Sequence, residues 1–163
     1  MPGLLNFRDL KYLHLSKRES EKLLLKRGDI LVNRTNSAAL VGKCAVFEAQ
    51  GDFSFASYLI RLRLDLSQVE PHLVAAYINS PLGRAYMLNE KRQMTGQANV
   101  NAPKLRALPL PLPALLSEQR RIVAELHALQ MQVDLLKRLQ AETDAELDAL
   151  LPAILDRAFR GEL

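Results

Sequence analysis

A narrow apolar stripe near the C-terminus constrains the fold of this chain more than any other feature. Its members step alternately by four and three positions, and the polar residues Gln140 and Thr143 interrupt them. The stripe consists of Ile122, Leu126, Leu129, Val133, Leu136, Leu147, Leu150 and Ile154. Such spacing predicts one long helix with a coiled-coil seam. We expect Ser117 to cap this helix, and Pro152 to kink it or to begin a new one.

The stripe also predicts a partner. From residue 118 to residue 151 the helix would be about 50 Å long at roughly 1.5 Å per residue. A small domain beside the helix cannot bury a narrow stripe of that length, so a second helix is required. Two copies of the chain are expected to form a homodimer through Ile122, Leu126, Leu129, Val133, Leu136, Leu147 and Leu150.

Charge divides the chain of 163 residues into a basic body and a mildly acidic tail. Residues 1–113 contain 16 Lys and Arg against 9 Asp and Glu, whereas residues 114–163 contain 6 against 9. The division indicates a polyanion-binding domain followed by a protein-contacting segment. A soluble protein with uneven surface charge gives the same counts, so charge alone leaves both interpretations open.

Local patterns predict that helices and short strands are mixed within the body. Ser16 or Ser20 caps a first helix that stops at Gly28-Asp29, and Ser80 caps a later one. Alternating leucine and proline predict an edge strand or an extended strap over 108–113. We expect strands at 30–32, 40–47 and 57–65, helices at 71–79 and 81–93, solvent-facing Arg61 and Arg63, and core positions for Phe53, Phe55, Tyr58, Tyr77 and Tyr86.

Several classes of protein do not fit this sequence. No stretch approaches the roughly 20 apolar residues of a membrane span, and the N-terminus has no export leader. Cys44 is the one cysteine and the three histidines are far apart, so we expect a cytoplasmic protein without a metal site. Neither a phosphate-binding glycine loop nor a nucleophile motif is present, so we expect no cofactor and no catalysis.

Two polar loops in the basic body are candidates for DNA binding. Arg and Lys donate to guanine, Asn and Gln pair with adenine, and hydroxyl groups suit phosphate oxygens. Because Asn, Ser and Gly also form ordinary turns, spacing alone leaves a purely structural role open. The candidates are Arg34, Asn36, Ser37 and Lys43 in the first loop, and Lys91, Arg92, Thr95, Gln97, Asn99, Asn101 and Lys104 in the second. We expect Arg34, Gln97 and Asn99 to contact bases, and Lys43, Lys91, Arg92 and Lys104 to contact phosphates.

An ordered set of short motifs strengthens the DNA-binding interpretation. The set comprises Leu25-x-x-Gly28-Asp29-Ile30-Leu31-Val32-x-Arg34, Val41-Gly42-Lys43, Ala56-Ser57-Tyr58-Leu59-Ile60-Arg61-Leu62, Asn79-Ser80-Pro81-x-Gly83-Arg84, Gly96-Gln97-x-Asn99-Val100-Asn101, Leu108-Pro109-Leu110-Pro111-Leu112-Pro113, Glu118-Gln119-x-x-Ile122-Val123 and Ala153-Ile154-Leu155-x-x-Ala158-Phe159-x-Gly161-Glu162-Leu163. In this order, the motifs resemble the DNA-specificity subunits of type I restriction-modification systems.

The resemblance implies an α+β protein. Its target-recognition domain, at 1–113, mixes helices with a curved sheet, and a long coiled-coil helix at 114–163 serves dimerisation and docking. The resemblance further implies double-stranded DNA, modification (methyltransferase) subunits and a restriction subunit as partners. Such a subunit catalyses nothing itself and directs adenine methylation and cleavage by those partners.

Two departures from the family pattern matter. The chain carries one domain-plus-helix half where the family has two, and its recognition domain starts late. We therefore expect a half-subunit or a fragment. An assembly module that binds the modification subunit with little DNA affinity is the alternative, whereas an autonomous base methyltransferase would need a cofactor loop that this sequence lacks.

Overall fold

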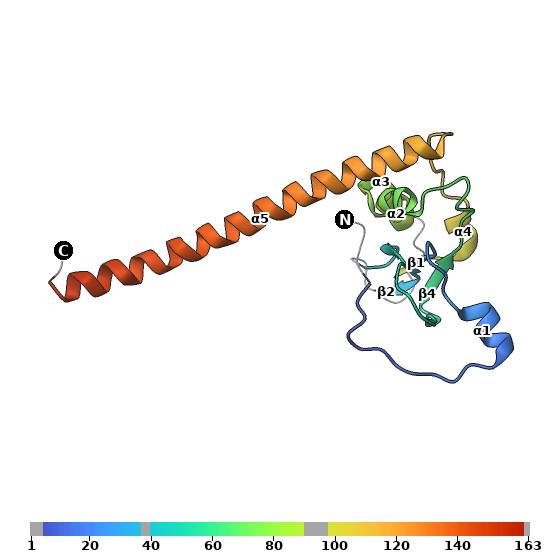
Figure 1. Cartoon of the computed structure of the whole chain (residues 1–163), viewed down its shortest axis with the longest axis horizontal. Helices are drawn as coiled ribbons and strands as arrows, with labels where there is room; N and C mark the ends of the chain where they lie inside the picture. The colour runs from blue at the N-terminus through green and yellow to red at the C-terminus, as the bar shows by residue number, and fades with distance from the viewer. Residues whose placement is uncertain (1–4, 37–39, 90–97, 162–163) are drawn as a thin grey trace. The chain divides into compact units, whose positions relative to one another are not determined.

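The computed structural model describes residues 5–36, 40–89 and 98–161 (Figure 1). The chain consists of two compact units, Met1–Val123 and Ala124–Leu163. Unit 1 mixes helices with two small antiparallel sheets, and a long C-terminal helix begins in unit 1 and forms unit 2. The predicted α+β class is confirmed. Among the described residues, no helix is long and apolar enough to cross a membrane.

The larger sheet has three strands, with β1 (Ile30–Asn33) between β3 (Cys44–Val46) and β4 (Leu59–Leu62). Both neighbours run antiparallel to β1. Side chains alternate across the strand. Ile30 and Val32 therefore belong to the larger buried cluster on one face, while Leu31 packs with a smaller cluster on the other.

Two helices contribute to the cluster on the Ile30 side. α2 (Pro71–Asn79) and α3 (Pro81–Asn89) begin at prolines, which suit the first helical turn. The Ser80 hydroxyl accepts a hydrogen bond from the Gly83 amide at 3.2 Å, as the predicted cap requires. A Cβ atom at Gly83 would lie 2.2 Å from the Tyr77 carbonyl oxygen, so only glycine permits this approach of α3 to α2.

The N-terminal helix is shorter than expected. α1 (Lys17–Leu23) begins with a capping box in which Ser16 and Glu19 each accept a hydrogen bond from the other's backbone amide. It ends five residues before Gly28, because the Leu25 amide donates to the Phe53 carbonyl at 2.8 Å and its side chain joins the smaller cluster. The predicted stop at Gly28-Asp29 is therefore wrong.

The strand expected at 40–47 is also shorter. A turn precedes β3, in which Gly42 has a φ of +76° and its amide donates to the Asn33 carbonyl at 2.8 Å. Since a positive φ is disfavoured for residues with a side chain, the strand begins only after this glycine. The strand expected at 57–65 is confined to β4, and Tyr58 is 58% exposed and does not belong to the core.

Arg63 is exposed as predicted and Arg61 is half-buried, but both side chains bind other residues of unit 1. Arg63 donates to both carboxylate oxygens of Asp29, from Nε at 2.8 Å and from Nη2 at 2.6 Å, and Asp29 is only 2% exposed. Arg61 donates to the Leu24 carbonyl at 3.0 Å and lies over the Phe55 ring. These contacts join β4 to the segment that follows α1.

A strap at 108–113 leads from unit 1 into the last helix. It is extended and pairs with no strand among the described residues. Leu108, Leu110 and Leu112 pack on the larger cluster, while the intervening prolines have no amide hydrogen to donate. Of the two predicted alternatives, an edge strand and an extended strap, the structure excludes the edge strand.

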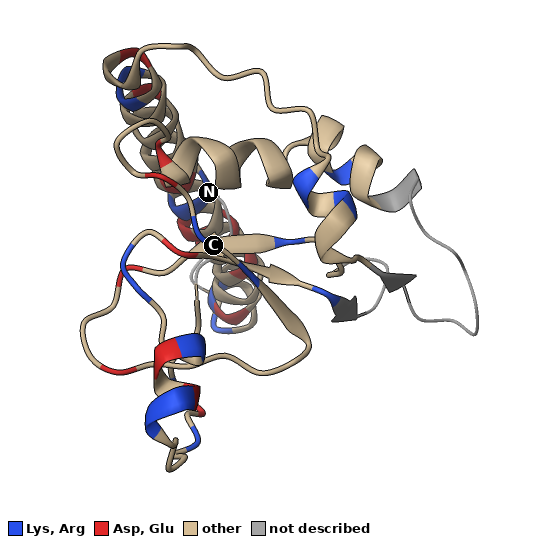
Figure 2. Ribbon diagram, turned by 90° about the vertical axis from the view of Figure 1, so that its right-hand side faces the viewer, with Lys and Arg blue, Asp and Glu red and all other residues tan. Residues whose placement is uncertain are grey.

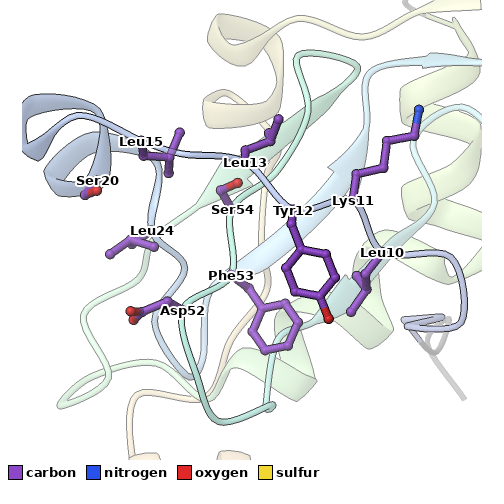
Figure 3. A pocket seen from close by; sticks show the side chains of 10 residues that line it. All are labelled: Leu10, Lys11, Tyr12, Leu13, Leu15, Ser20, Leu24, Asp52, Phe53 and Ser54. Atoms are coloured by element: carbon purple, nitrogen blue, oxygen red, sulfur yellow. The ribbon is translucent and has the colours of Figure 1, made fainter.

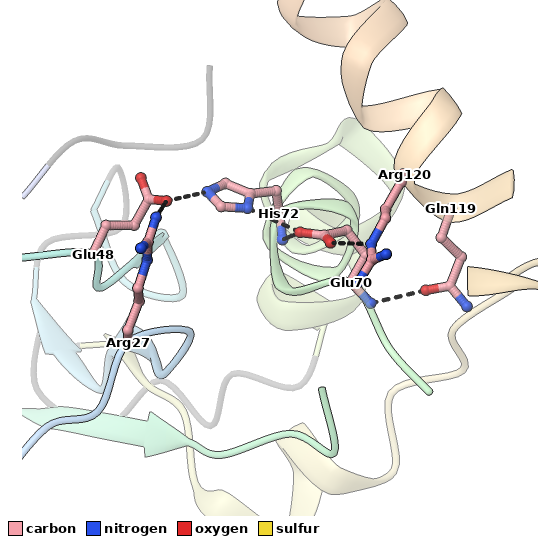
Figure 4. A network of polar contacts seen from close by, with 6 residues as sticks. All are labelled: Arg27, Glu48, Glu70, His72, Gln119 and Arg120. Carbon is pink, nitrogen blue, oxygen red and sulfur yellow. Dashed lines mark hydrogen bonds and ion pairs between the residues drawn. The ribbon is translucent and has the colours of Figure 1, made fainter. Parts of the chain in front are cut away.

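The first turns of the last helix, α5 (Leu116–Phe159), belong to unit 1 and contain one buried side chain. Gln119 is 2% exposed, and its amide nitrogen donates to the carbonyls of Gln68 at 3.1 Å and Pro113 at 2.8 Å. Its oxygen accepts from the Glu70 amide at 2.9 Å (Figure 4). Three hydrogen bonds thus satisfy a group that would be costly to bury alone.

The ends and the interior of α5 differ from expectation. The helix begins at Leu116, so Ser117 lies inside its first turn and the predicted cap is wrong. Pro152 lies within α5 and begins no new helix. The carbonyl four residues earlier, which Pro152 cannot bond, belongs to the exposed Asp148 and is accessible to water.

We predict that Gln119→Ala lowers the free energy of unfolding by about 2 kcal/mol, because it leaves two carbonyls and one amide without partners. Urea unfolding monitored by circular dichroism measures the loss. Gln132→Ala, at an exposed position of the same helix, is the matched control and should change stability by less than about 0.5 kcal/mol. Equal effects of the two substitutions would contradict a structural role for Gln119.

The Asp29–Arg63 ion pair predicts a pH dependence. Burial alone would raise the pKa of Asp29, but the hydrogen bonds from Arg63 and the Lys26 amide, with the charges of Arg63 and Arg61, lower it. The pair therefore stabilises the fold above the unfolded pKa of about 3.9, and this contribution is lost as pH falls through the folded pKa.

Accordingly, Asp29→Asn should lower the free energy of unfolding by on the order of 2 kcal/mol near neutral pH. The difference from wild type should shrink below about pH 4, and urea titrations over an acid pH series measure it. Asp52→Asn, at an exposed turn, is the control. A difference that stays constant with pH would rule out a role for the Asp29 charge.

Candidate nucleic-acid interface

The two polar loops predicted from the sequence meet in a small sheet. β2 (Thr35–Asn36) pairs antiparallel with β5 (Ala98–Asn99), with Thr35 opposite Asn99 and Asn36 opposite Ala98. The Val100 amide extends this pairing by donating to the Arg34 carbonyl at 2.9 Å. The sequence predicted a loop at Arg34–Ser37 without a strand, so this pairing is a correction that brings the two groups together.

Arg34 has a fixed backbone and an exposed side chain. Its amide donates to the Tyr58 carbonyl at 2.8 Å, next to β4, while its carbonyl accepts from Val100 on the other side. The backbone therefore cannot shift without disturbing both sheets. An exposed guanidinium on a fixed backbone is suited to directional hydrogen bonding with a base edge or a phosphate.

Lys43 lies next to Arg34, at the end of the turn before β3. Its carbonyl accepts a hydrogen bond from the Asn33 amide at 2.9 Å, and its side chain is exposed. Arg84 of α3 donates to the Val41 carbonyl in the same turn, and Gly42 packs against Met87. The α3 helix thus fixes the turn that presents Lys43.

Asn101 and Lys104 follow β5 directly. Asn101 caps the short helix α4 (Ala102–Arg106), and its side-chain oxygen accepts a hydrogen bond from the Lys104 amide at 3.0 Å. The Tyr86 hydroxyl donates to the Lys104 carbonyl at 3.3 Å. Lys104 is half-buried and Arg106, which the sequence analysis did not single out, is exposed.

Several candidates cannot be placed. Ser37, Lys91, Arg92, Thr95 and Gln97 lie outside the described residues. The strand pairing locates Asn36 and Asn99 in the small sheet. Of the eleven predicted DNA-binding residues, the structure brings together Arg34, Asn36, Lys43, Asn99, Asn101 and Lys104 along connected backbone segments.

The described segments that form this surface contain basic residues and no acidic ones, while Glu90 lies outside the described residues between two of them. Residues 30–47, 71–89 and 98–117 include no Asp or Glu, and they carry Arg34, Lys43, Arg84, Lys104 and Arg106. In Figure 2, no red segment interrupts the blue segments on the right of the view. We call the surface formed by Arg34, Lys43, Asn101, Lys104 and Arg106, together with β2 and β5, the basic face. Its charge favours a polyanion.

Asn79, the first residue of the motif Asn79-Ser80-Pro81-x-Gly83-Arg84, has a structural role. Its side-chain nitrogen donates to the Cys44 carbonyl at 2.9 Å and its oxygen accepts from the Cys44 amide at 3.1 Å. These bonds join α2 to β3. Burial raises the pKa of the Cys44 thiol to about 12, so the thiol stays protonated near neutral pH. Neither residue carries chemistry, and no metal-binding cluster occurs among the described residues.

Polar networks elsewhere in unit 1 are structural too. Glu70 at the start of α2 contacts His72 at 3.0 Å and Arg120 at 3.8 Å, and His72 also reaches Glu48 at 3.5 Å (Figure 4). Glu70 joins this network to Gln119 through its own amide. The sequence analysis did not predict the network, although the motif Glu118-Gln119 shortly after the proline-rich strap was the signal available.

A pocket of about 290 Å³ lies under the N-terminal segment (Figure 3). Leu10 and Tyr12 line the pocket from that segment. Phe53, which packs against the smaller cluster, and Leu24, which precedes the cluster residue Leu25, line its other side. Its lining includes one lysine and one carboxylate, Lys11 and Asp52, and none of the predicted DNA-binding residues. The pocket therefore shares no lining residue with the basic face.

Comparison with known proteins identifies the family. Residues 5–144 match the model of the type I restriction modification DNA specificity domain. The chain therefore belongs to the family of type I restriction-modification DNA specificity domains, and the resemblance drawn from its motifs is confirmed.

The chain is similar to the specificity subunits of two named type I restriction enzymes. It is 33% identical over 153 residues to that of StySPI from Salmonella potsdam, covering 93% of this chain and 33% of that protein. It is 28% identical over 164 residues to that of EcoKI from Escherichia coli K12, covering 99% and 35%. The chain thus spans about a third of the length of these curated relatives.

One solved structure is similar in both sequence and fold. It comes from work on complex assembly and conformational transition of the type I R-M system. The match has a TM-score of 0.66 and 37% sequence identity, and it covers 86% of this chain and 33% of that one. The similarity therefore includes the fold as well as the motifs.

Proposed function

We propose that this chain recognises a specific DNA sequence through the basic face, as one half of a type I specificity subunit. The observation that carries the proposal is the β2–β5 pairing, which joins two polar loops far apart in sequence into one surface whose described segments contain no Asp or Glu. A surface of this charge attracts phosphates, and exposed Arg and Asn groups on it read bases. Membership of a DNA specificity family supports the same conclusion.

The residues of the basic face divide by chemistry. Arg34, Asn99 and Gln97 are proposed to contact base edges, because their side chains form paired hydrogen bonds with guanine or adenine. Lys43 and Lys104, together with Lys91 and Arg92, are proposed to contact phosphates, which a point charge neutralises without reading sequence. The remaining candidates, Asn36, Ser37, Thr95 and Asn101, are proposed to contribute further polar contacts with the DNA.

The chain is shorter than its relatives, so the proposed complex contains a second copy of it. StySPI and EcoKI are type I restriction enzymes whose specificity subunits are about three times as long as this chain. A second copy, paired through the seam of α5, would supply a second basic face and so a second half-site. Modification and restriction subunits would perform adenine methylation and cleavage in the cytoplasm, and the chain itself would catalyse nothing.

Lys43→Ala should weaken binding to every DNA sequence alike. It should also make the slope of log affinity against log salt less steep by about one unit, as expected for the loss of one phosphate contact. Fluorescence anisotropy over a salt series measures both. Lys22→Ala on α1, where Lys22 lies among Glu19 and Glu21, is the control and should leave the slope unchanged. An unchanged slope for Lys43→Ala would exclude this contact.

Arg34→Ala should instead change sequence preference. Selection from a random duplex library with the wild-type chain defines the preferred site. Arg34→Ala should lose about 1–3 kcal/mol of affinity for that site and little for random DNA, because a base contact carries the discrimination. If selection enriches no motif while the chain binds a modification subunit tightly, it acts as an assembly module.

A further inference from the structure

Tyr58, which the sequence analysis assigned to the core, is an exposed aromatic residue beside the basic face. It directly precedes β4, and its side chain is 58% exposed. Tyr77 and Tyr86, by contrast, pack against the larger cluster. Within the described part of the chain, the Tyr58 ring and hydroxyl have no hydrogen-bond or aromatic partner. An exposed ring with an available hydroxyl is typical of a binding surface.

The register of the larger sheet places Tyr58 directly across from Arg34. β1 and β4 lie side by side and pair antiparallel, with Asn33 opposite Leu59 (Figure 1). The next pair outward is Arg34 and Tyr58, and the Arg34 amide donates to the Tyr58 carbonyl at 2.8 Å. Residues directly opposite each other on antiparallel strands have Cβ atoms about 4.5–5.5 Å apart on one face of the sheet. The two exposed side chains are therefore neighbours.

The backbone that presents Tyr58 is fixed. The Leu59 amide donates to the Ala56 carbonyl at 2.9 Å, which closes a turn directly before β4. On the other side of Arg34, the Val100 amide donates to the Arg34 carbonyl at 2.9 Å, so Tyr58, Arg34 and Val100 lie on three adjacent segments. Residues 53–64 contain no Asp or Glu, so this segment adds no negative charge to the surface. Tyr58 thus extends the basic face by one held position.

The spacing of Arg34 and Tyr58 suits two adjacent base pairs. Neighbouring strands lie about 4.8 Å apart, whereas bases along one DNA strand are about 3.4 Å apart, so the separation is closer to one base step than to two. Arginine reads guanine through O6 and N7 in the major groove, which is about 12 Å wide. A ring about 5 Å from Arg34 therefore remains within the groove and lies away from the phosphates.

We propose that the Tyr58 ring contacts the C5-methyl group of a thymine next to the guanine that Arg34 reads. That methyl is the apolar group that a base presents in the major groove, and aromatic side chains bind it. Tyr58 is then a specificity-determining residue that discriminates thymine from cytosine. The inference rests on the proposed function, because it requires the basic face to bind DNA and Arg34 to contact a base.

Selection from a random duplex library tests whether the two residues read adjacent positions. Arg34→Ala and Tyr58→Ala should each relax one position of the wild-type site, a guanine for Arg34 and the adjacent thymine for Tyr58. Tyr12→Ala is the matched control and should leave the site unchanged, because Tyr12 is 96% exposed and lines the pocket under the N-terminal segment. Relaxation by Tyr58→Ala at a distant position, or at a G·C pair, overturns the inference.

Uracil in place of that thymine removes only the methyl group. Wild type should bind the uracil duplex about fourfold more weakly in fluorescence anisotropy, as expected for the loss of one buried methyl contact. Tyr58→Ala should bind both duplexes equally, whereas Tyr58→Phe keeps the ring and should keep the fourfold difference. If uracil has no effect and Tyr58→Phe weakens binding to all sequences alike, the hydroxyl contacts a phosphate and the inference is wrong.

This inference and the proposed function fail in different ways. If the wild-type chain binds no DNA, or selection enriches no motif, the proposed function fails and the role of Tyr58 fails with it. If Arg34→Ala relaxes the site and Tyr58→Ala does not, only the role of Tyr58 is wrong. Because both Tyr58 substitutions change an exposed side chain, the variants should unfold at the same urea concentration as wild type.

Discussion

The buried side chain of Gln119 connects three parts of unit 1 that otherwise only adjoin. It binds the end of the 108–113 strap, the loop before α2 and the start of α2 at Glu70, and it does so from the first turns of α5. An amide can do this because it offers two donors and one acceptor with two lone pairs in a rigid plane. The strap can therefore remain extended without strand partners, since its leucines pack on the core and its last carbonyl is bonded to the helix that follows.

The basic face depends on structural residues that never reach DNA in the proposed mode. Asn79 bonds β3 through Cys44, Arg84 bonds the turn before it, and Gly83 permits α3 to lie close enough for that contact. Several residues of the family motifs thus build the framework, whereas Arg34 and Lys43, which belong to the same set of motifs, are exposed on it. Polar residues that a rigid scaffold holds in place are suited to binding.

Local chemistry made much of this fold predictable. Pro71, Ser80 and Pro81 mark helix boundaries by their own conformational preferences, so α2 was predicted to the residue and the start of α3 was correct. The β2–β5 pairing was not predictable, because it joins two polar dipeptides more than 60 residues apart and leaves no apolar alternation. The Arg63–Asp29 pair was not predicted either, because alternation places Arg63 on the outer face of the strand expected at 57–65, and only the tertiary fold brings a buried carboxylate there.

The two units use charge in different ways. In unit 1, acid-free segments leave a net positive field that extends beyond contact distance, which suits attraction of a polyanion. In unit 2, Arg138 pairs with Glu142 and Arg160 with Asp156, but eight acidic residues stand against four basic ones, so unit 2 keeps a net negative charge. Such local pairs contribute only a few tenths of a kcal/mol each, which is too little to account for an exposed helix of this length. Burial of the leucine seam would be the larger source of stability for unit 2, and the proposed pairing with a second helix would provide it.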